Sequence, residues 1–149
     1  MYDFIDQPVE SLDNGGRFLL WAMRGWTRAT GRGGCAPAAL VRGFAGVGAL
    51  AALPHFHMAM AVLNREAGEP LTLAPMACLQ IAEDEALLAS LWRDAALGHD
   101  TTLRATLTLM INEAAVAPAA QALTAAAERL ASVGLAPFEA SCEAHKESK

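Results

Sequence analysis

The sequence has little of the material from which β-strands are built. It contains a single tyrosine, aromatic residues make up 6% of it, and valine and isoleucine are scarce beside alanine and leucine. β-Branched and aromatic side chains favour strands, whereas alanine and leucine favour helices. The hydrophobic share is 54% and the chain has 149 residues, which is enough for one buried core without disulfides or a metal. We therefore expect one compact all-α domain, a bundle of about five to six helices.

Sequence patterns that mark enzymes and cofactor sites are also lacking. There is no G-x-S-x-G nucleophile elbow and no Glu-x-x-His pair of the kind that holds two irons in a bundle. The glycines at 31–34 lack the preceding strand, the lysine and the hydroxyl of a phosphate-binding P-loop. We expect no cofactor, and a binding protein rather than an enzyme.

The cysteines give no disulfide pattern. Cys35, Cys78 and Cys142 lie far apart, and an odd number without close spacing indicates free thiols in a reducing compartment. No basic segment followed by an apolar one opens the chain, which begins with an acidic stretch. A cytoplasmic location is the expectation.

Charge is unevenly distributed along the chain, whose net charge is −5. Residues 1–13 are acidic, residues 14–65 contain six arginines and no acid, and acids dominate again from Glu66. The basic middle could bind phosphate groups or pair with the acidic ends. The net negative charge argues against nucleic acid, and so does the acidic start of the candidate recognition helix at Asp100.

Capping residues, prolines and glycines predict where the helices begin and end. A break between Gly46 and Pro54 is favoured, although residues 36–67 could also form one kinked helix. The window 43–64 carries no charge, but Pro54, two histidines and three glycines within it predict two packed helices rather than a membrane span. The expected helices run from Ser11 or Asp13 to the glycines at 31–34, from 36–37 to the break, over 55–67, from 82 to 97, from 100 to 114, and from Pro118 to 133.

Residues 69–80 form a connection that is too apolar for an ordinary loop. Its two prolines argue against a helix, and four large apolar side chains are expected to hold it on the core. A long ordered connection within a compact domain is more often functional than a short one.

The residues most suited to ligand binding lie within this connection and on either side of it. His55 and His57 are separated by two positions, which on a helix places them roughly 200° apart, so they could share a metal only in an extended turn. Acids at the start of the fourth helix could act as general acid and base, but they also suit the helix dipole or an ion pair with an arginine of the first two helices. The candidate ligand-binding residues are His55, His57, Met76, Cys78, Glu83 and Asp84, with no metal assigned to them.

Two functions fit these observations. The first is a non-enzymatic helical interaction domain that self-associates as a homodimer, because the apolar excess and three tryptophans indicate helix faces that one small bundle does not cover. The alternative is a small-molecule or metal-binding pocket near His55, His57 and Cys78, covered by the 69–80 connection. Either function would reside in residues 1–135, followed by a polar tail over 136–149.

Overall fold

Helices make up nearly all of the regular structure in the computed structural model, which describes residues 4–137. No strand occurs in this part of the chain, so the expected all-α class and the single helical bundle are confirmed. The predicted polar tail lies outside the described residues from position 138 onward. The elements in chain order are η2 (Val9–Ser11), α1 (Asn14–Gly31), α2 (Ala36–Gly46), η3 (Leu50–Ala52), α3 (Leu53–Glu66), α4 (Glu83–Leu97), α5 (Asp100–Met110) and α6 (Glu113–Ala131).

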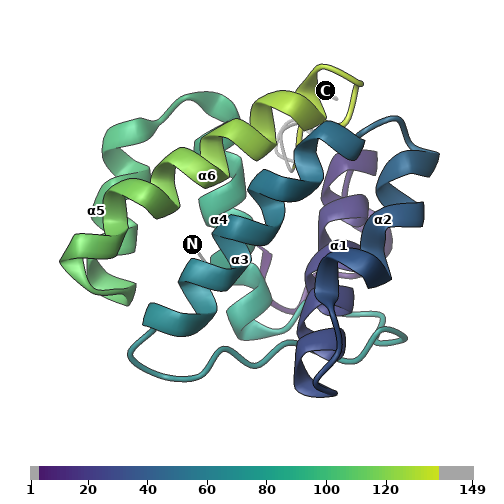
Figure 1. The fold of residues 1–149 in the computed structure, drawn as a ribbon, viewed down its shortest axis with the longest axis horizontal. Helices are drawn as coiled ribbons and strands as arrows, with labels where there is room; N and C mark the ends of the chain where they lie inside the picture. The colour runs from purple at the N-terminus through teal and green to yellow at the C-terminus, as the bar shows by residue number, and fades with distance from the viewer. Residues whose placement is uncertain (1–3, 138–149) are drawn as a thin grey trace.

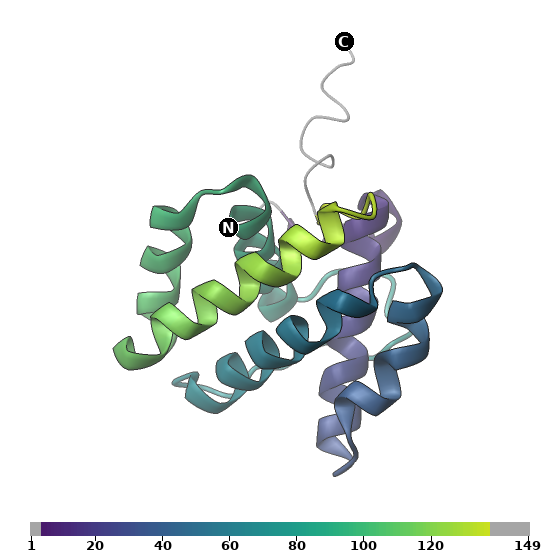
Figure 2. The same ribbon diagram turned by 45° about the horizontal axis from the view of Figure 1, so that its top comes forward.

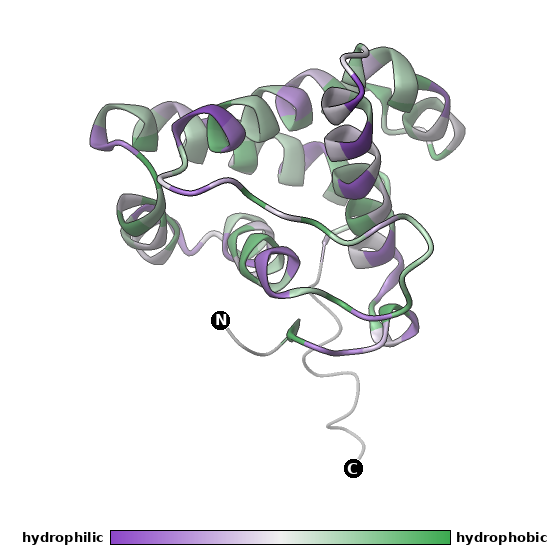
Figure 3. Cartoon of the chain, turned by 90° about the horizontal axis from the view of Figure 1, so that it is seen from below, coloured by the Kyte–Doolittle hydropathy of each residue, from purple (hydrophilic) through white to green (hydrophobic). Residues whose placement is uncertain are grey.

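The helices are arranged around the pair formed by α3 and α6, which lie side by side across the molecule (Figures 1 and 2). α1 and α2 pack against each other on one side of this pair, and α4 and α5 pack on α6. Aromatic rings from three helices are in contact in the core. The centroid of the Phe56 ring lies 5.5 Å from that of Phe44 and 5.9 Å from that of Trp92. The connection between α3 and α4 crosses the face of the molecule seen in Figure 3.

Local signals placed the first helices correctly. The Asp13 side chain accepts a hydrogen bond from the Gly16 N–H at 2.7 Å and so caps α1. α2 ends at Gly46, and α3 begins at Leu53 after the short η3. The uncharged window is thus divided between two helices, as expected. None of the helices described has both the length and the apolar character needed to cross a membrane.

The prediction was wrong at the junction of α5 and α6. α5 ends at Met110 rather than at 114, and α6 begins at Glu113 rather than at Pro118. The Asn112 side chain accepts a hydrogen bond from the Ala114 N–H at 3.1 Å and caps α6. The helix therefore begins five residues before Pro118, which was expected to occupy its first position. Pro118 therefore lies inside the helix, where its missing N–H leaves the carbonyl of exposed Ala114 without its usual helical donor.

The described part of the chain ends against the start of α1. Gly134 has φ +81°, and the Leu135 N–H donates to the Leu130 carbonyl at 2.9 Å, as expected for a glycine-terminated helix. The backbone then passes so close to Gly15 that a Cβ there would lie 2.5 Å from the Leu135 carbonyl oxygen. Only glycine fits at this crossing.

Candidate functional site

The 69–80 connection has no regular secondary structure, yet its backbone is held on both sides. On one side it pairs with the N-terminal segment, where the Val9 N–H donates to the Leu79 carbonyl at 2.8 Å and the Ile81 N–H donates to the Gln7 carbonyl at 2.9 Å. On the other side it meets α1 and α4. The expectation of an ordered connection is thereby confirmed, but the expectation that four apolar side chains hold it on the core is only partly correct. Leu71 and Leu73 pack against the core, whereas Leu79 is 72% exposed, and hydrogen bonds fix much of the path.

Arg24 of α1 is the centre of that second attachment. Its guanidinium donates to the Glu85 carboxylate at 2.7 and 2.9 Å, and to the carbonyl oxygens of Cys78 and Gln80 at 2.8 and 2.9 Å. A longer contact of 3.5 Å reaches the Met76 carbonyl. All five N–H donors of a guanidinium are thus directed at acceptors. The Arg24 side chain is only 3% exposed, and protein acceptors take the place of water around its guanidinium.

Glu85 of α4 is saturated in the same way and is fully buried. Its two oxygens accept from Arg24, from the Ala74 N–H at 2.9 Å and from the Ala82 N–H at 2.9 Å. The bond from Ala82 is the return half of a capping box, which satisfies a backbone group that precedes the helix. The hydrogen bond to Glu85 raises the pKa of Arg24 above its ordinary value, and Arg24 is charged throughout the neutral range. One ion pair therefore joins α1, α4 and the connection.

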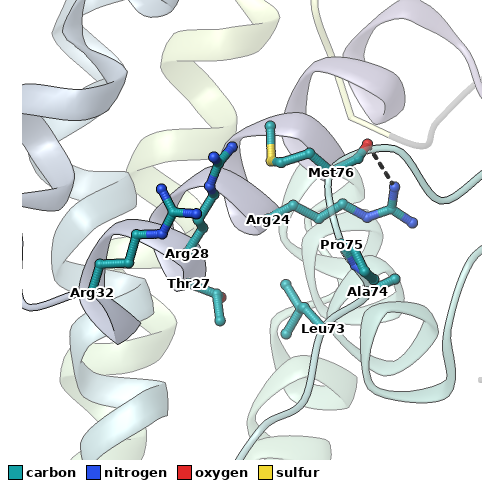
Figure 4. A pocket seen from close by; sticks show the side chains of 8 residues that line it. All are labelled: Arg24, Thr27, Arg28, Arg32, Leu73, Ala74, Pro75 and Met76. Carbon is teal, nitrogen blue, oxygen red and sulfur yellow. Dashed lines mark hydrogen bonds between the residues drawn. The ribbon is translucent and has the colours of Figure 1, made fainter.

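A cleft opens beside this ion pair, between α1 and residues 73–76 (Figure 4). Its volume is about 450 Å³. Arg28 and Arg32 follow Arg24 at steps of four residues, so all three line the same wall. In Figure 4, Arg24 turns toward the Met76 carbonyl, whereas the Arg28 and Arg32 guanidinium groups lie together on the other side.

A second cleft, of about 290 Å³, lies between α1 and α2. It shares Arg28, Arg32 and Met76 with the first cleft, so these three side chains stand at the junction of the two. The rest of its lining is apolar or small, and consists of Trp21, Gly25, Ala29, Ala39 and Leu40.

Arg28 and Arg32 differ from Arg24 in their partners. Both are exposed, and neither forms an ion pair with any carboxylate of the described residues. They occupy the last turn and the end of α1, where the helix dipole stabilises cations and therefore accounts for their presence in part. Their guanidinium donors remain available, and a guanidinium matches a carboxylate or a phosphate with two parallel hydrogen bonds. This junction can therefore hold an anion.

The structure brings only part of the predicted site together. Met76 lines both clefts, and Cys78 lines a neighbouring one with Arg17 and Arg24, of about 290 Å³. Cys78 is exposed, and the carbonyl that Arg24 contacts is its own, so its backbone takes part in the attachment of the connection.

The predicted histidines and acids serve other contacts. His57 accepts a hydrogen bond at Nδ1 from the Trp26 indole N–H at 3.0 Å. Trp26 and Arg24 are two positions apart on α1, so they face directions roughly 200° apart. His57 therefore lies away from the arginine side.

His55 is also on α3, and it is half-buried. Asp84 accepts from the Thr72 N–H at 2.7 Å and so adds another attachment of the connection, while Glu83 is exposed in the first turn of α4. No three His, Cys, Asp or Glu side chains gather closely enough to hold a metal within residues 4–137.

Sequence reasoning anticipated some of this site and missed the rest. It treated the arginines of residues 14–65 as a basic segment that could bind phosphate groups, and it allowed an acid of the fourth helix to pair with an arginine of the first two helices. It did not place Arg28 and Arg32 together as a site, although their spacing of four residues puts them on one helix face. No local signal could have shown that Glu85, which is 61 positions from Arg24, would form an ion pair with Arg24 and not with Arg28 or Arg32.

Comparisons of the chain with protein-family models, with curated proteins and with solved structures find no match.

Proposed function

We propose that this protein is a non-enzymatic binding domain and that Arg28 and Arg32 hold the carboxylate or phosphate group of its ligand. The observation that carries the proposal is the contrast along one helix face. Arg24 is buried and saturated by Glu85, whereas Arg28 and Arg32 have no acidic partner among the described residues and border two clefts. This proposal refines the predicted interhelical pocket, keeping Met76 and replacing the histidines with arginines.

Two-dimensional NMR of the arginine Nε–H groups during titration with inorganic phosphate tests this site. We expect the Arg28 and Arg32 signals to shift together and saturate. Arg28→Gln or Arg32→Gln should weaken phosphate binding about tenfold or more, because a hydrogen bond to a charged group contributes roughly 1.5–3 kcal/mol.

Arg42→Gln is the matched control, since Arg42 is an exposed arginine of α2 that lines neither cleft. Its removal should leave phosphate binding unchanged. Equal shifts at Arg42 and at Arg28 would show non-specific attraction to positive charge and would count against the proposal.

Self-association is a second proposal, carried by a separate surface. Leu50 and Met58 are 47% and 53% exposed, and with exposed Pro54 they follow one another at steps of four residues along η3 and α3. Val47, which is 41% exposed, comes shortly before them at the end of α2. Such a strip in an uncharged segment suits the face of a homodimer.

Sedimentation velocity of wild type and Met58→Glu tests this second proposal. We expect the variant to shift toward monomer. Leu109→Glu is the control, because Leu109 is 85% exposed on α5 and lies outside the strip. A wild-type protein that stays monomeric at high micromolar concentration contradicts self-association.

The two cysteines described suit a cytoplasmic protein. Cys35 and Cys78 are both exposed free thiols. Exposed thiols remain reduced in the cytosol, whereas an oxidising compartment would pair or modify them. We therefore propose a reducing compartment as the working location.

A further inference from the structure

We infer that the ligand of the arginine junction is amphipathic: a single carboxylate or phosphate group held by Arg28 and Arg32, with a short apolar body lying in the cleft between α1 and α2. This inference rests on the proposed function and adds the chemical class of the ligand. Its basis is the composition of the smaller cleft, where two cations border a wall that is otherwise carbon. An inorganic anion alone would leave that wall exposed to water.

Two glycines shape this apolar wall. A Cβ on Gly43 would lie 2.2 Å from the Trp21 ring, so the outer edge of the indole lies against the α2 backbone there. A Cβ on Gly25 would lie 2.9 Å from a Leu40 methyl group, so Leu40 likewise reaches the α1 backbone. Trp21 also packs on Phe18, with ring centroids 5.6 Å apart. The wall is therefore formed by packed side chains before any ligand arrives, which lowers the entropic cost of binding.

Trp21 remains accessible from the cleft. It is 36% exposed, whereas Trp26 and Trp92 are 4% and 0% exposed. An apolar ligand body beside Trp21 would remove water from its ring, and burial of apolar surface is favourable by about 0.8 kcal/mol per methylene. Arginine side chains also contribute apolar stems beneath their charged ends. The same residues can therefore bind both parts of an amphipathic anion.

The volume of the cleft limits the ligand. At roughly 30 Å³ for each small group of atoms, the 290 Å³ between α1 and α2 accommodates about ten non-hydrogen atoms. An eight-carbon chain or a bicyclic aromatic ring fits this size, and the further carbons of a longer chain would extend beyond the cleft. The anionic group lies at the junction, and any further polar part extends into the larger cleft beside residues 73–76.

The test is a fluorescence titration of Trp21 with alkyl phosphates and alkyl carboxylates of four, six, eight and ten carbons. We expect affinity to rise about fourfold with each added methylene up to roughly eight carbons and then to level off. Octanol, which has the same chain without the charge, should bind at least tenfold more weakly than octyl phosphate. Comparing octanoate with octyl phosphate distinguishes a carboxylate ligand from a phosphate ligand, and Trp21→Phe should remove the fluorescence change.

A pair of α2 variants locates the apolar body. Ala39 lines the smaller cleft and Ala38 does not, although both are exposed on α2 and leucine suits a helix at either position. Ala39→Leu should weaken the binding of octyl phosphate by about fivefold or more, because the leucine side chain fills the space for the alkyl chain. The binding of inorganic phosphate should be unchanged. Ala38→Leu should change neither.

The outcomes separate this inference from the proposed function. Affinity that is independent of chain length, or an Ala39→Leu variant that binds octyl phosphate normally, overturns the amphipathic ligand while the anion site stands. Octanol binding as tightly as octyl phosphate overturns the anion site itself. Chain-length dependence that persists in Arg28→Gln, with every affinity lowered about tenfold, supports both.

Discussion

Replacing Arg24 by methionine is the most direct test of how the connection is held. The substitution keeps most of the aliphatic volume and removes the cation. Glu85 then remains a fully buried carboxylate with the two backbone N–H groups of Ala74 and Ala82 but without a counter-charge. Breaking a buried ion pair from one side costs about 3–5 kcal/mol. That is a large part of the roughly 5–15 kcal/mol by which a domain of this kind is stable.

The assay is urea unfolding followed by circular dichroism, combined with hydrogen exchange of the amides over residues 72–82. We expect Arg24→Met to lower the free energy of unfolding by about 3–5 kcal/mol and to speed exchange at Ala74 and Ala82. Arg28→Met is the matched control one turn further along α1, and as an exposed substitution it should change stability by less than about 0.5 kcal/mol.

The double variant Arg24→Met with Glu85→Leu separates the charge from the attachment. Replacing both charges with apolar groups should recover much of the lost stability, so the two effects should not add. Hydrogen exchange over residues 72–82 should stay fast in the double variant, because the Ala74 and Ala82 N–H groups have lost the carboxylate that accepts their hydrogen bonds. A loss below about 1 kcal/mol in Arg24→Met, or strict additivity in the double variant, would refute the view that one buried pair holds the connection.

Three further substitutions test local features of the fold. Gly15→Ala should destabilise the protein by about 1–3 kcal/mol in thermal unfolding, because its Cβ would meet the Leu135 carbonyl at 2.5 Å; an unchanged melting temperature would contradict the close crossing. In urea unfolding, Trp92→Phe should lower the free energy of unfolding less than Trp26→Phe does. The buried Trp92 indole N–H has no hydrogen-bond partner in the described structure, whereas that of Trp26 bonds to a histidine. A larger loss in Trp92→Phe would refute this reasoning. Pro118→Ala should raise stability by about 1 kcal/mol or more, since it restores a helical N–H in the interior of α6, and a loss of stability would show that the proline is needed there.

Local chemistry explains how much of the fold could be predicted. Asp13 and the glycine at 134 act on backbone groups within a few residues, so their effect could be read from spacing alone. The start of α6 was misplaced because two local signals competed, and the Asn112 cap began the helix ahead of Pro118. The order of helices followed from such signals, and no tertiary information was needed for it.

The candidate site was less accessible to prediction because it depends on which distant groups meet. His57 looked like a ligand, but its ring nitrogen accepts from Trp26 once α1 and α3 pack together. Asp84 looked like an acid for catalysis, but it accepts from the backbone of Thr72. The arginines were visible as a cluster, and only the position of Glu85 in the folded chain divides them into a buried structural cation and two exposed ones.

The way Arg24 reaches the connection has a consequence for how this protein can change over generations. Its contacts at positions 76, 78 and 80 are with carbonyl oxygens, which every amino acid carries. The hydrogen bonds that hold positions 76, 78 and 80 are therefore independent of the side chains there, and substitutions at 76–79 alter the lining of the clefts while these bonds remain. A library randomised at 76–79 on an intact Arg24–Glu85 pair would vary what the protein recognises while preserving its fold, as a hypervariable loop does on a fixed framework.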